Sequence, residues 1–329
     1  MALLIPAFVS VGQSGSTLAT VQARGKLNCG VNQALPGFGF LQSDGSFSGF
    51  DVDYCRALAG AVLGDGNAVE FFPLTAAQRF DVLASGEIDV LSRNTTWTIS
   101  RDTDLGNNFA PTTFYDGQGF MVRKDSGITD LKGLDGASIC VATGTTTEAN
   151  LADTFAQLGL SFEPVVFEKA DDVVNAYDSG RCDAFTTDKS GLASRLGTLK
   201  DPSNNVVLAQ TISKEPLGPL TRHGDDQWFD IAKWTVFALF FAEEKGITQA
   251  NVAGFSSTNP EINRFLGVGS KTVADKLGLG ADAFANAIAA VGNYGEIYDR
   301  NLVPLGLERA GTLNASYLDG GLIYAPPFR

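Results

Sequence analysis

Three short segments of the chain concentrate side chains that could hold a small molecule. They are 92–101, 143–148 and 187–189, and each directly follows an apolar run that we predict to be a strand. Together they supply hydroxyl groups, guanidinium groups and a carboxylate. Hydroxyl and guanidinium groups bind anions, whereas a carboxylate binds a cation. The residue types therefore indicate a site for a small charged solute.

The middle segment, 144–148, reads Gly-Thr-Thr-Thr-Glu and is predicted to begin a helix. Free N–H groups and hydroxyls at a helix start hold a carboxylate or a phosphate. Ordinary capping also explains the segment, because Thr145 as N-cap and Glu148 three residues later match a capping box. Capping alone does not need three hydroxyls, so both interpretations stay open. The segment is not a P-loop, since no Gly-Lys-Ser/Thr follows.

Arg101 and Asp188 carry the two opposite charges that a zwitterion would require. The planar guanidinium of Arg101 can hold a carboxylate through two parallel hydrogen bonds, and Asp188 can accept an ammonium group. Arg101 could instead pair with Asp102 or Asp104 at the surface. Asp188 could be a turn residue paired with Lys189. Taken together the two charges predict a site for an α-amino acid, and a few charged hydrogen bonds of roughly 1.5–3 kcal/mol each can reach micromolar affinity.

Strand and helix signals alternate along the chain, and this pattern starts twice. Such an order indicates an α/β fold with mostly parallel sheets flanked by helices. Because ligands of open α/β sheets bind beyond the carboxyl ends of the strands, we expect the three polar segments to face each other across a cleft. The predicted strands are 26–31, 69–72, 88–91, 119–123, 138–142, 164–167, 182–186, 206–209 and 212–220. The predicted helices are 52–62, 76–85, 147–158, 170–179, 226–245, 261–265 and 281–298.

The composition excludes several classes of protein. A length of 329 residues favours two domains, and 44% hydrophobic with 19% charged residues argues against disorder. The net charge is −13 and no block of Lys and Arg occurs, so nucleic acid is not an expected partner. His223 is the one histidine, which removes most His-rich metal sites and makes any Ser-His-Asp triad depend on this single residue. We expect neither a metal nor a cofactor.

No apolar run approaches the ~18–20 residues that cross a bilayer, and the longest interior run is 234–242. The first fifteen residues combine an apolar stretch with small residues but have no basic n-region. They fit a clipped or atypical export signal, and they fit a disordered terminus equally well.

Four cysteines allow three pairings by disulfide bonds. Pairing Cys29 with Cys55 and Cys140 with Cys182 would cross-link each half of the chain separately and would suit an oxidising compartment. Four buried free thiols are the alternative, since cysteine is often buried.

The chain resembles the periplasmic polar amino-acid-binding proteins of ABC importers, solute-binding protein family 3. The likeness is carried by the blocks 49–53, 79–89, 92–101 and 144–148. Five further blocks resemble the general L-amino-acid-binding subgroup: 116–124, Glu215-Pro-Leu-Gly-Pro219, 224–230, Gly292-Asn-Tyr-Gly-Glu296 and 320–327. The resemblance extends from about residue 25 to the C-terminus.

This resemblance implies a type II periplasmic-binding-protein fold of two lobes joined by two hinge strands. The expected divisions are an N-terminal segment 1–24, a first part of lobe 1 at 25–118, lobe 2 at 119–217, and the return to lobe 1 at 218–329 with the C-terminal helices and tail. The implied protein is a periplasmic monomer. It would capture L-amino acids with broad specificity and deliver them to an ABC permease in the inner membrane.

The resemblance also implies which residues hold the α-carboxylate of the ligand. Arg101 resembles the arginine that grips this group, assisted by Thr96 and by the backbone around Asn94. Thr145 and Thr146 resemble the groups of the second lobe that close over the same carboxylate.

Other positions are implied to bind the rest of the ligand. Asp188 resembles the acceptor of the α-ammonium group, and Arg79 resembles an arginine that reaches the side-chain carboxylate in binders of acidic amino acids. A charge on a helix surface is the alternative for Arg79. The aromatic residues that stack on basic ligands are not both present: Phe38 is displaced by one or two positions, and Ala76 stands at the other position. Trp97 is expected to shape the pocket instead, and specificity is expected to be broad.

Two other functions compete with ligand capture. An enzyme on the same scaffold, such as a dehydratase with a carboxylate acid, is disfavoured because the polar segments contain no His or Cys nucleophile beside a base. A ligand-sensing domain of a receptor would need a membrane-spanning helix after the second lobe, and the sequence up to Arg329 contains none.

Overall fold

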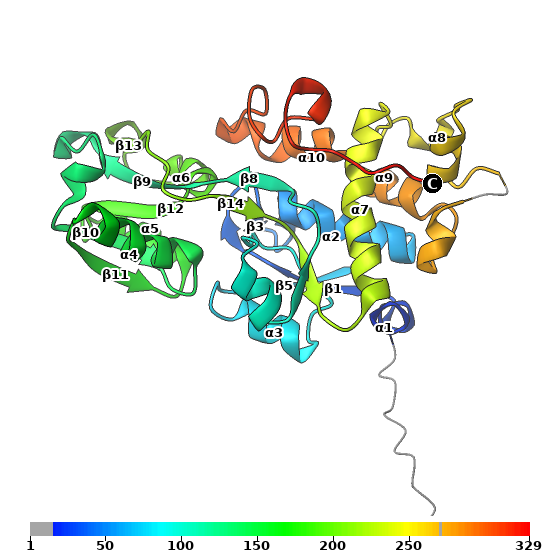
Figure 1. Cartoon of the computed structure of the whole chain (residues 1–329), viewed down its shortest axis with the longest axis horizontal. Helices are drawn as coiled ribbons and strands as arrows, with labels where there is room; N and C mark the ends of the chain where they lie inside the picture. Colours follow the sequence, from blue (N-terminus) through cyan, green and yellow to red (C-terminus); the bar gives the residue numbers. More distant parts are fainter. Residues whose placement is uncertain (1–15, 270–271) are drawn as a thin grey trace, which may run out of the picture.

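The computed structural model describes residues 16–269 and 272–329 and shows two lobes, each built on a five-stranded sheet (Figure 1). The predicted export segment, 1–15, lies outside the described residues. Within the described ranges, no helix is both long and apolar enough to cross a membrane.

The first lobe has a sheet whose central strands are parallel. Strand β1 (Leu27–Val31) pairs in parallel with β5 (Val69–Pro73) on one side and with β6 (Val90–Leu91) on the other. Strand β15 (Leu220–Arg222) pairs with β6 in antiparallel orientation, and the edge strand β7 (Asn107–Phe109) pairs in antiparallel orientation with β15. A small antiparallel sheet of β2 (Ala34–Leu35), β3 (Gly39–Leu41) and β4 (Phe47–Ser48) follows β1.

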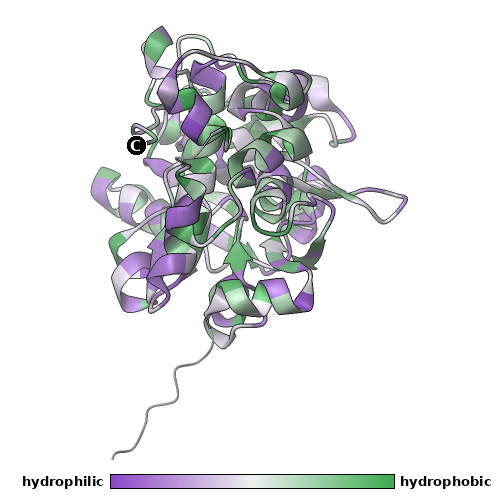
Figure 2. Cartoon of the chain, turned by 90° about the vertical axis from the view of Figure 1, so that its right-hand side faces the viewer, coloured by the Kyte–Doolittle hydropathy of each residue, from purple (hydrophilic) through white to green (hydrophobic). Residues whose placement is uncertain are grey.

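Helices of the first lobe bury a large apolar core around this sheet. The core contains the side chains of Trp228, Phe240 and Tyr294, all 3% exposed or less. Hydrophobic and hydrophilic residues alternate along the helices in Figure 2, as expected for helices with one buried face. The helices are α1 (Thr17–Arg24), α2 (Phe50–Leu63), α3 (Arg79–Ser85), α7 (Asp226–Glu244), α8 (Pro260–Phe265), α9 (Ala283–Val291) and α10 (Tyr294–Asn301).

The second lobe repeats the arrangement with a sheet in the order β11-β10-β12-β9-β13. Successive side chains of a strand point to opposite faces, so Ile139 and Val141 pack on one face and Cys140 on the other. Helix α4 (Thr146–Leu158) covers the first face, while α5 (Ala170–Asp178) and α6 (Lys189–Leu196) cover the second. The strands are β9 (Gln118–Arg123), β10 (Ala137–Ala142), β11 (Phe162–Phe167), β12 (Ala184–Asp188) and β13 (Asn205–Val207).

Two antiparallel strands connect the lobes. Strand β8 (Phe114–Asp116) leads into the second lobe and β14 (Glu215–Leu217) leads back, and the two lie side by side in Figure 1. They are the expected pair of hinge strands. The divisions at 118/119 and 217/218 remain our proposal for where one lobe passes into the other.

Both predicted disulfide bonds are present, and each lies within one lobe. Cys29–Cys55 links β1 to α2, and Cys140–Cys182 links β10 to the segment before β12. The alternative of four free thiols is thereby excluded.

Several elements differ from the predicted ones. Helix α1 and helix α6 have no predicted counterpart, and Leu18 and Val21 of α1 are buried in the first core. The predicted helix 281–298 is two helices, because Gly292 takes φ +84° and Asn293 begins α10 with a capping box. The predicted return strand 212–220 is also divided, and only β14 and the start of β15 lie within it.

Candidate functional site

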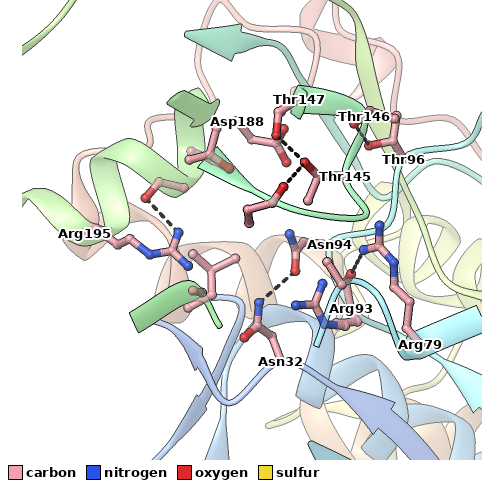
Figure 3. Close-up of a pocket in the computed structure, with 17 residues that line it drawn as sticks. Asn32, Arg79, Arg93, Asn94, Thr96, Thr145, Thr146, Thr147, Asp188 and Arg195 are labelled. Carbon is pink, nitrogen blue, oxygen red and sulfur yellow. Dashed lines mark hydrogen bonds between the residues drawn. The ribbon is translucent and has the colours of Figure 1, made fainter. Parts of the chain in front are cut away.

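A pocket lies between the lobes at the carboxyl ends of strands β6, β10 and β12 (Figure 3). The space between its walls is about 550 Å³, part of which is open solvent. Both lobes supply its walls: Asn32, Leu35, Ala76, Arg79, Arg93, Asn94 and Thr96 from the first, and Ala142, Thr145, Thr146, Thr147, Ala170, Thr187, Asp188, Ser190, Gly191 and Arg195 from the second. Six of the residues predicted to bind ligand are among them, namely Arg79, Asn94, Thr96, Thr145, Thr146 and Asp188.

Asp188 ends strand β12 and begins helix α6, with its side chain only 7% exposed. No hydrogen bond or ion pair to this carboxylate occurs in the described part of the chain, so Lys189 is not its partner there. Burial raises the pKa of Asp188 well above its usual value, and the neighbouring carboxylates of Asp116 and Glu215 add to the effect. Arg79 and Arg101 act in the opposite direction. A buried carboxylate that faces a pocket without a donor is suited to a cationic group of a ligand.

Helix α4 turns its N-terminus toward the same pocket. The Thr145 hydroxyl accepts from the Glu148 backbone N–H at 3.1 Å and donates to the Ala142 carbonyl at 2.7 Å, so this side chain is the N-cap. The Glu148 carboxylate accepts from the Gly144 N–H at 3.1 Å, one residue before the position that a capping box requires. Thr146 and Thr147 lie in the open first turn of the helix, where N–H groups have no partner within the helix and favour an anion.

Glu215 of hinge strand β14 is the acceptor that joins the two lobes beneath the pocket. Its side chain is 1% exposed. Oε2 accepts from the hydroxyl of Thr96 at 2.6 Å and from that of Thr146 at 2.8 Å, and these threonines belong to opposite lobes. Oε1 accepts from Asn150 Nδ2 at 2.8 Å and from Ser213 Oγ at 2.5 Å. Since a hydroxyl has one proton, both threonines present lone pairs to the pocket while they donate to Glu215.

Arg101 does not line this pocket, although it contacts Thr96, which does. It belongs to the short π-helix η1 (Ser100–Asp104), and its Nη1 donates to the Thr96 carbonyl at 2.9 Å. The guanidinium carbon is 5.2 Å from the centre of the Phe80 ring. No other hydrogen bond of this guanidinium, and no ion pair with Asp102 or Asp104, occurs within the described residues. Burial lowers the pKa of Arg101, whereas the negative charges of Glu215 and Asp188 raise it.

Arg79 begins helix α3 and does reach the pocket wall, which excludes a position at the helix surface. It is 3% exposed, and Nη1 donates to the Arg93 carbonyl at 3.4 Å and to Thr95 Oγ1 at 3.3 Å. Nε has no hydrogen-bond partner within the described residues. Burial lowers the pKa of Arg79 well below its usual value, and Arg101 and Arg93 contribute to this shift. Such a guanidinium gains from an anionic ligand.

Asn94 is held in place by a network within the first lobe. Its backbone has φ +30°, a left-handed conformation that asparagine tolerates. The N–H donates to Asp51 Oδ2 at 2.7 Å, and the side-chain oxygen accepts from Asn32 at 3.1 Å. Burial raises the pKa of Asp51 to about 7, although the Asn94 N–H and Arg93 oppose the shift.

The two aromatic residues predicted at the site lie elsewhere. Phe38 is 1% exposed and packs edge-on against Phe114, with ring centres 5.2 Å apart, in the core of the first lobe. Trp97 is 43% exposed and stacks on Phe109, and its Nε1 donates to Asp102 at 2.6 Å. Thr96 and Trp97 are consecutive in an extended segment, so their side chains point to opposite sides.

Several residues of the wall were not predicted to bind ligand, among them Asn32, Arg93, Thr147, Ser190 and Arg195. Arg93 stands inside the polar segment 92–101, which was a usable signal. Arg195 belongs to the unpredicted helix α6, so nothing in the sequence placed it near a ligand.

Comparison with known proteins relates the whole chain to one family. The model of the bacterial extracellular solute-binding proteins, family 3, matches residues 27–301. The general L-amino acid-binding periplasmic protein of Rhizobium johnstonii is 55% identical over 96% of this chain and 94% of its own length. A putative amino-acid ABC transporter-binding protein of Escherichia coli K12 is 44% identical over 100% of this chain and 97% of its own.

A solved structure of high similarity also exists. It is an ABC transporter periplasmic binding protein of Brucella ovis with glutathione bound. The two chains are 51% identical and superpose with a TM-score of 0.92, covering 95% of this chain and 99% of that one.

Proposed function

The chain belongs to the bacterial extracellular solute-binding proteins of family 3, and from this premise we propose that it captures L-amino acids of several kinds between its lobes. The membership confirms the resemblance, the two-lobed α/β fold and the location outside the cytoplasm. We infer that the captured amino acid passes to an ABC permease, as the name of the Escherichia coli relative suggests for that protein. One chain contains the complete pocket, so we expect it to act as a monomer.

The observation that carries this proposal is the pair of opposite charges around one small pocket. The carboxylate of Asp188 has no partner in the described chain, and the guanidinium of Arg79 is only partly hydrogen-bonded. The open N-terminus of helix α4 adds N–H donors next to them. An α-amino acid has an ammonium group for Asp188 and a carboxylate for the donors.

Arg101 does not line the pocket, but it is hydrogen-bonded to the carbonyl of Thr96, which does. We therefore propose that Arg101 and the N-terminus of α4 hold the α-carboxylate and that Asp188 holds the α-ammonium. Because Arg101 uses only Nη1 for the Thr96 carbonyl, its other two nitrogens are left for the ligand. The resemblance assigns Thr96 and Thr146 to the α-carboxylate. Because both hydroxyls donate to Glu215, we propose instead that their oxygens accept from the ammonium group. Asn94 and Thr145 complete the two opposite walls.

Closure of the lobes would couple binding to recognition by the permease. The hydroxyls of Thr96 and Thr146 are 3.4 Å apart, and Thr75 Oγ1 donates to Glu168 across the cleft at 3.3 Å. A ligand that touches both lobes binds the closed form more tightly and shifts the population toward it. The permease then needs to recognise only the closed form.

We propose further that the protein does not convert its ligand. The relatives are named as binding proteins, and no Cys or His is among the described residues that line the pocket. A nucleophile with an adjacent base, which a cleft enzyme would need, is not assembled there. A mass-spectrometric search for turnover of a bound amino acid tests this point.

A γ-glutamyl peptide is a second candidate ligand. The Brucella ovis protein was solved with glutathione bound, and three guanidinium groups stand on the pocket wall of this chain. A solute with two carboxylates would use more than one of these groups. Calorimetric titration with glutathione, side by side with L-glutamine, decides between the two ligands.

A thermal-shift screen against the common L-amino acids tests the proposed function directly. A ligand that binds the folded state stabilises it by RT ln(1 + [L]/Kd), so true ligands raise the melting temperature.

Arg101→Ala should weaken binding by well over tenfold, since one charged hydrogen bond contributes ~1.5–3 kcal/mol, while leaving the fold intact. Wild-type affinity of this variant in calorimetry would refute the role of Arg101, and no shift with any amino acid would refute the function.

A further inference from the structure

Two guanidinium groups on the pocket wall are not needed to hold the α-groups of an amino acid. Arg93 follows strand β6 in the first lobe, and Arg195 lies in helix α6 of the second. Figure 3 shows both side chains directed into the space between the lobes. They are 6% and 7% exposed. Each lobe thus contributes one buried cation to the same part of the cleft.

The hydrogen bonds of both groups are incomplete. Arg93 donates from Nε to the Leu74 carbonyl at 2.7 Å and makes no other side-chain hydrogen bond within the described residues. Arg195 makes two contacts at 3.4 Å, one to the Gly191 carbonyl and one across the cleft to the Ala34 carbonyl, which is long for an N–H donor. Its Nε has no partner among these residues. A guanidinium has five N–H donors, so several remain for a ligand.

No acidic side chain of the described chain compensates either cation at contact distance. All five ion pairs found there involve other residues. Asp51 is the acidic group that influences Arg93, while Asp171 and Asp188 influence Arg195. Asp51 already accepts the Asn94 N–H, and we assign Asp188 to the ligand's ammonium. The wall therefore has three guanidinium groups against one carboxylate.

The two cations also oppose closure of the empty cleft. Burial lowers the pKa of Arg93 and of Arg195 to about 10, and the charge of Arg195 lowers that of Arg93 further. Like charges that approach each other in a partly desolvated space repel. An anion between them would remove this repulsion and add charge-assisted hydrogen bonds to both lobes.

We propose that Arg93 and Arg195 form a second anion subsite that takes the side-chain carboxylate of an acidic amino acid. The subsite spans the cleft, unlike Arg79, which lies on the first lobe alone. Acidic amino acids are therefore bound more tightly than their amides, which have no second negative charge. The inference rests on the proposed function and specifies its preferred ligands.

Titration calorimetry of L-glutamate and L-glutamine tests the subsite, because the two ligands share every α-group. Arg195→Gln should weaken glutamate binding about tenfold or more, the effect of one charged hydrogen bond. Glutamine binding should change by less than about threefold, and this retained binding also shows that the variant folds. Arg181→Gln is the matched control, since it removes an exposed arginine from the same lobe and should change neither affinity.

The ratio of the two affinities separates the possible outcomes. An equal loss for glutamate and glutamine, or no loss for either, would overturn the subsite and leave the proposed function standing. Failure of the wild-type protein to bind either amino acid would overturn both. Arg93→Gln removes the partner from the other lobe and should change the ratio in the same direction, so the subsite stays testable if Arg195→Gln does not fold.

Discussion

At the scale of single residues, the site depends on carboxylates that are costly to keep charged. Burial raises the pKa of Asp51 to about 7 and that of Asp116 to about 6, and it also raises the pKa of Asp188 well above its usual value. Asp51 and Asp116 accept backbone N–H groups of the protein, whereas Asp188 has no such donor in the described chain. Asp188 is therefore the residue whose charge a ligand must stabilise.

The pH dependence of stability follows from these shifts. A carboxyl group whose pKa is higher in the folded chain stabilises the fold most below its unfolded value and loses this contribution as the pH rises through the folded value. The melting temperature of the ligand-free protein should therefore fall between about pH 5 and pH 8. The ammonium group of a bound amino acid favours the charged carboxylate, so the fall should be smaller with ligand.

Differential scanning calorimetry across this pH range, with and without ligand, measures both slopes. Asp188→Asn is the control for this carboxyl group and should show a smaller fall without ligand. A ligand-free melting temperature that rises with pH in this window would contradict the raised pKa values.

At the scale of elements, the alternation of strands and helices was predictable because periodic apolar residues reflect burial in a sheet or on a helix face. The polar segments after the predicted strands therefore pointed to Thr145 and Asp188, whereas Asn94 was implied only by the family resemblance. Helix α6 was not predictable, because Leu192 and Leu196 are its only large apolar residues and charged or small residues surround them. Its position is set by packing against the sheet, and so is that of Arg195.

The hinge strand β14 contributes a prediction at the same scale. Each of the two carboxylate oxygens of Glu215 accepts two hydrogen bonds, and the donors come from both lobes. A glutamine side chain has only one oxygen, so its NH₂ group would face two of these donors and their hydrogen bonds would be lost. Glu215→Gln should lower the free energy of unfolding by roughly 1–3 kcal/mol and weaken amino-acid binding. Urea denaturation and calorimetry measure the two effects. Glu163→Gln, an exposed position of the second lobe, should change neither, and equal behaviour of the two variants would contradict the role of Glu215.

At the scale of the whole molecule, function requires the two lobes to meet, and Gly144 lies where they do. Its φ is +71°, and a Cβ there would be 3.0 Å from the Ala77 Cα of the other lobe. Gly144→Ala should therefore hinder closure and weaken binding at least tenfold. The backbone strain itself should cost about 1–2 kcal/mol of stability.

Gly180→Ala isolates the backbone strain from the contact between lobes. Gly180 belongs to the same lobe and has φ +84°, but a Cβ there would meet no atom within 4 Å. This variant should lose stability to a similar extent and keep its affinity for amino acids. Calorimetry on both variants makes the comparison, and a similar loss of affinity in the two would contradict a closed binding state.

The proposed function requires the lobes to close over both charged ends of one amino acid. Titration calorimetry of L-glutamate, glutarate and 4-aminobutyrate measures the contribution of each end, because glutarate lacks the α-ammonium group and 4-aminobutyrate lacks the α-carboxylate. We expect binding of L-glutamate, with glutarate and 4-aminobutyrate each weaker by more than a hundredfold, since each loses charged hydrogen bonds of ~1.5–3 kcal/mol apiece. Binding of either analogue as tightly as L-glutamate would contradict recognition of the zwitterion.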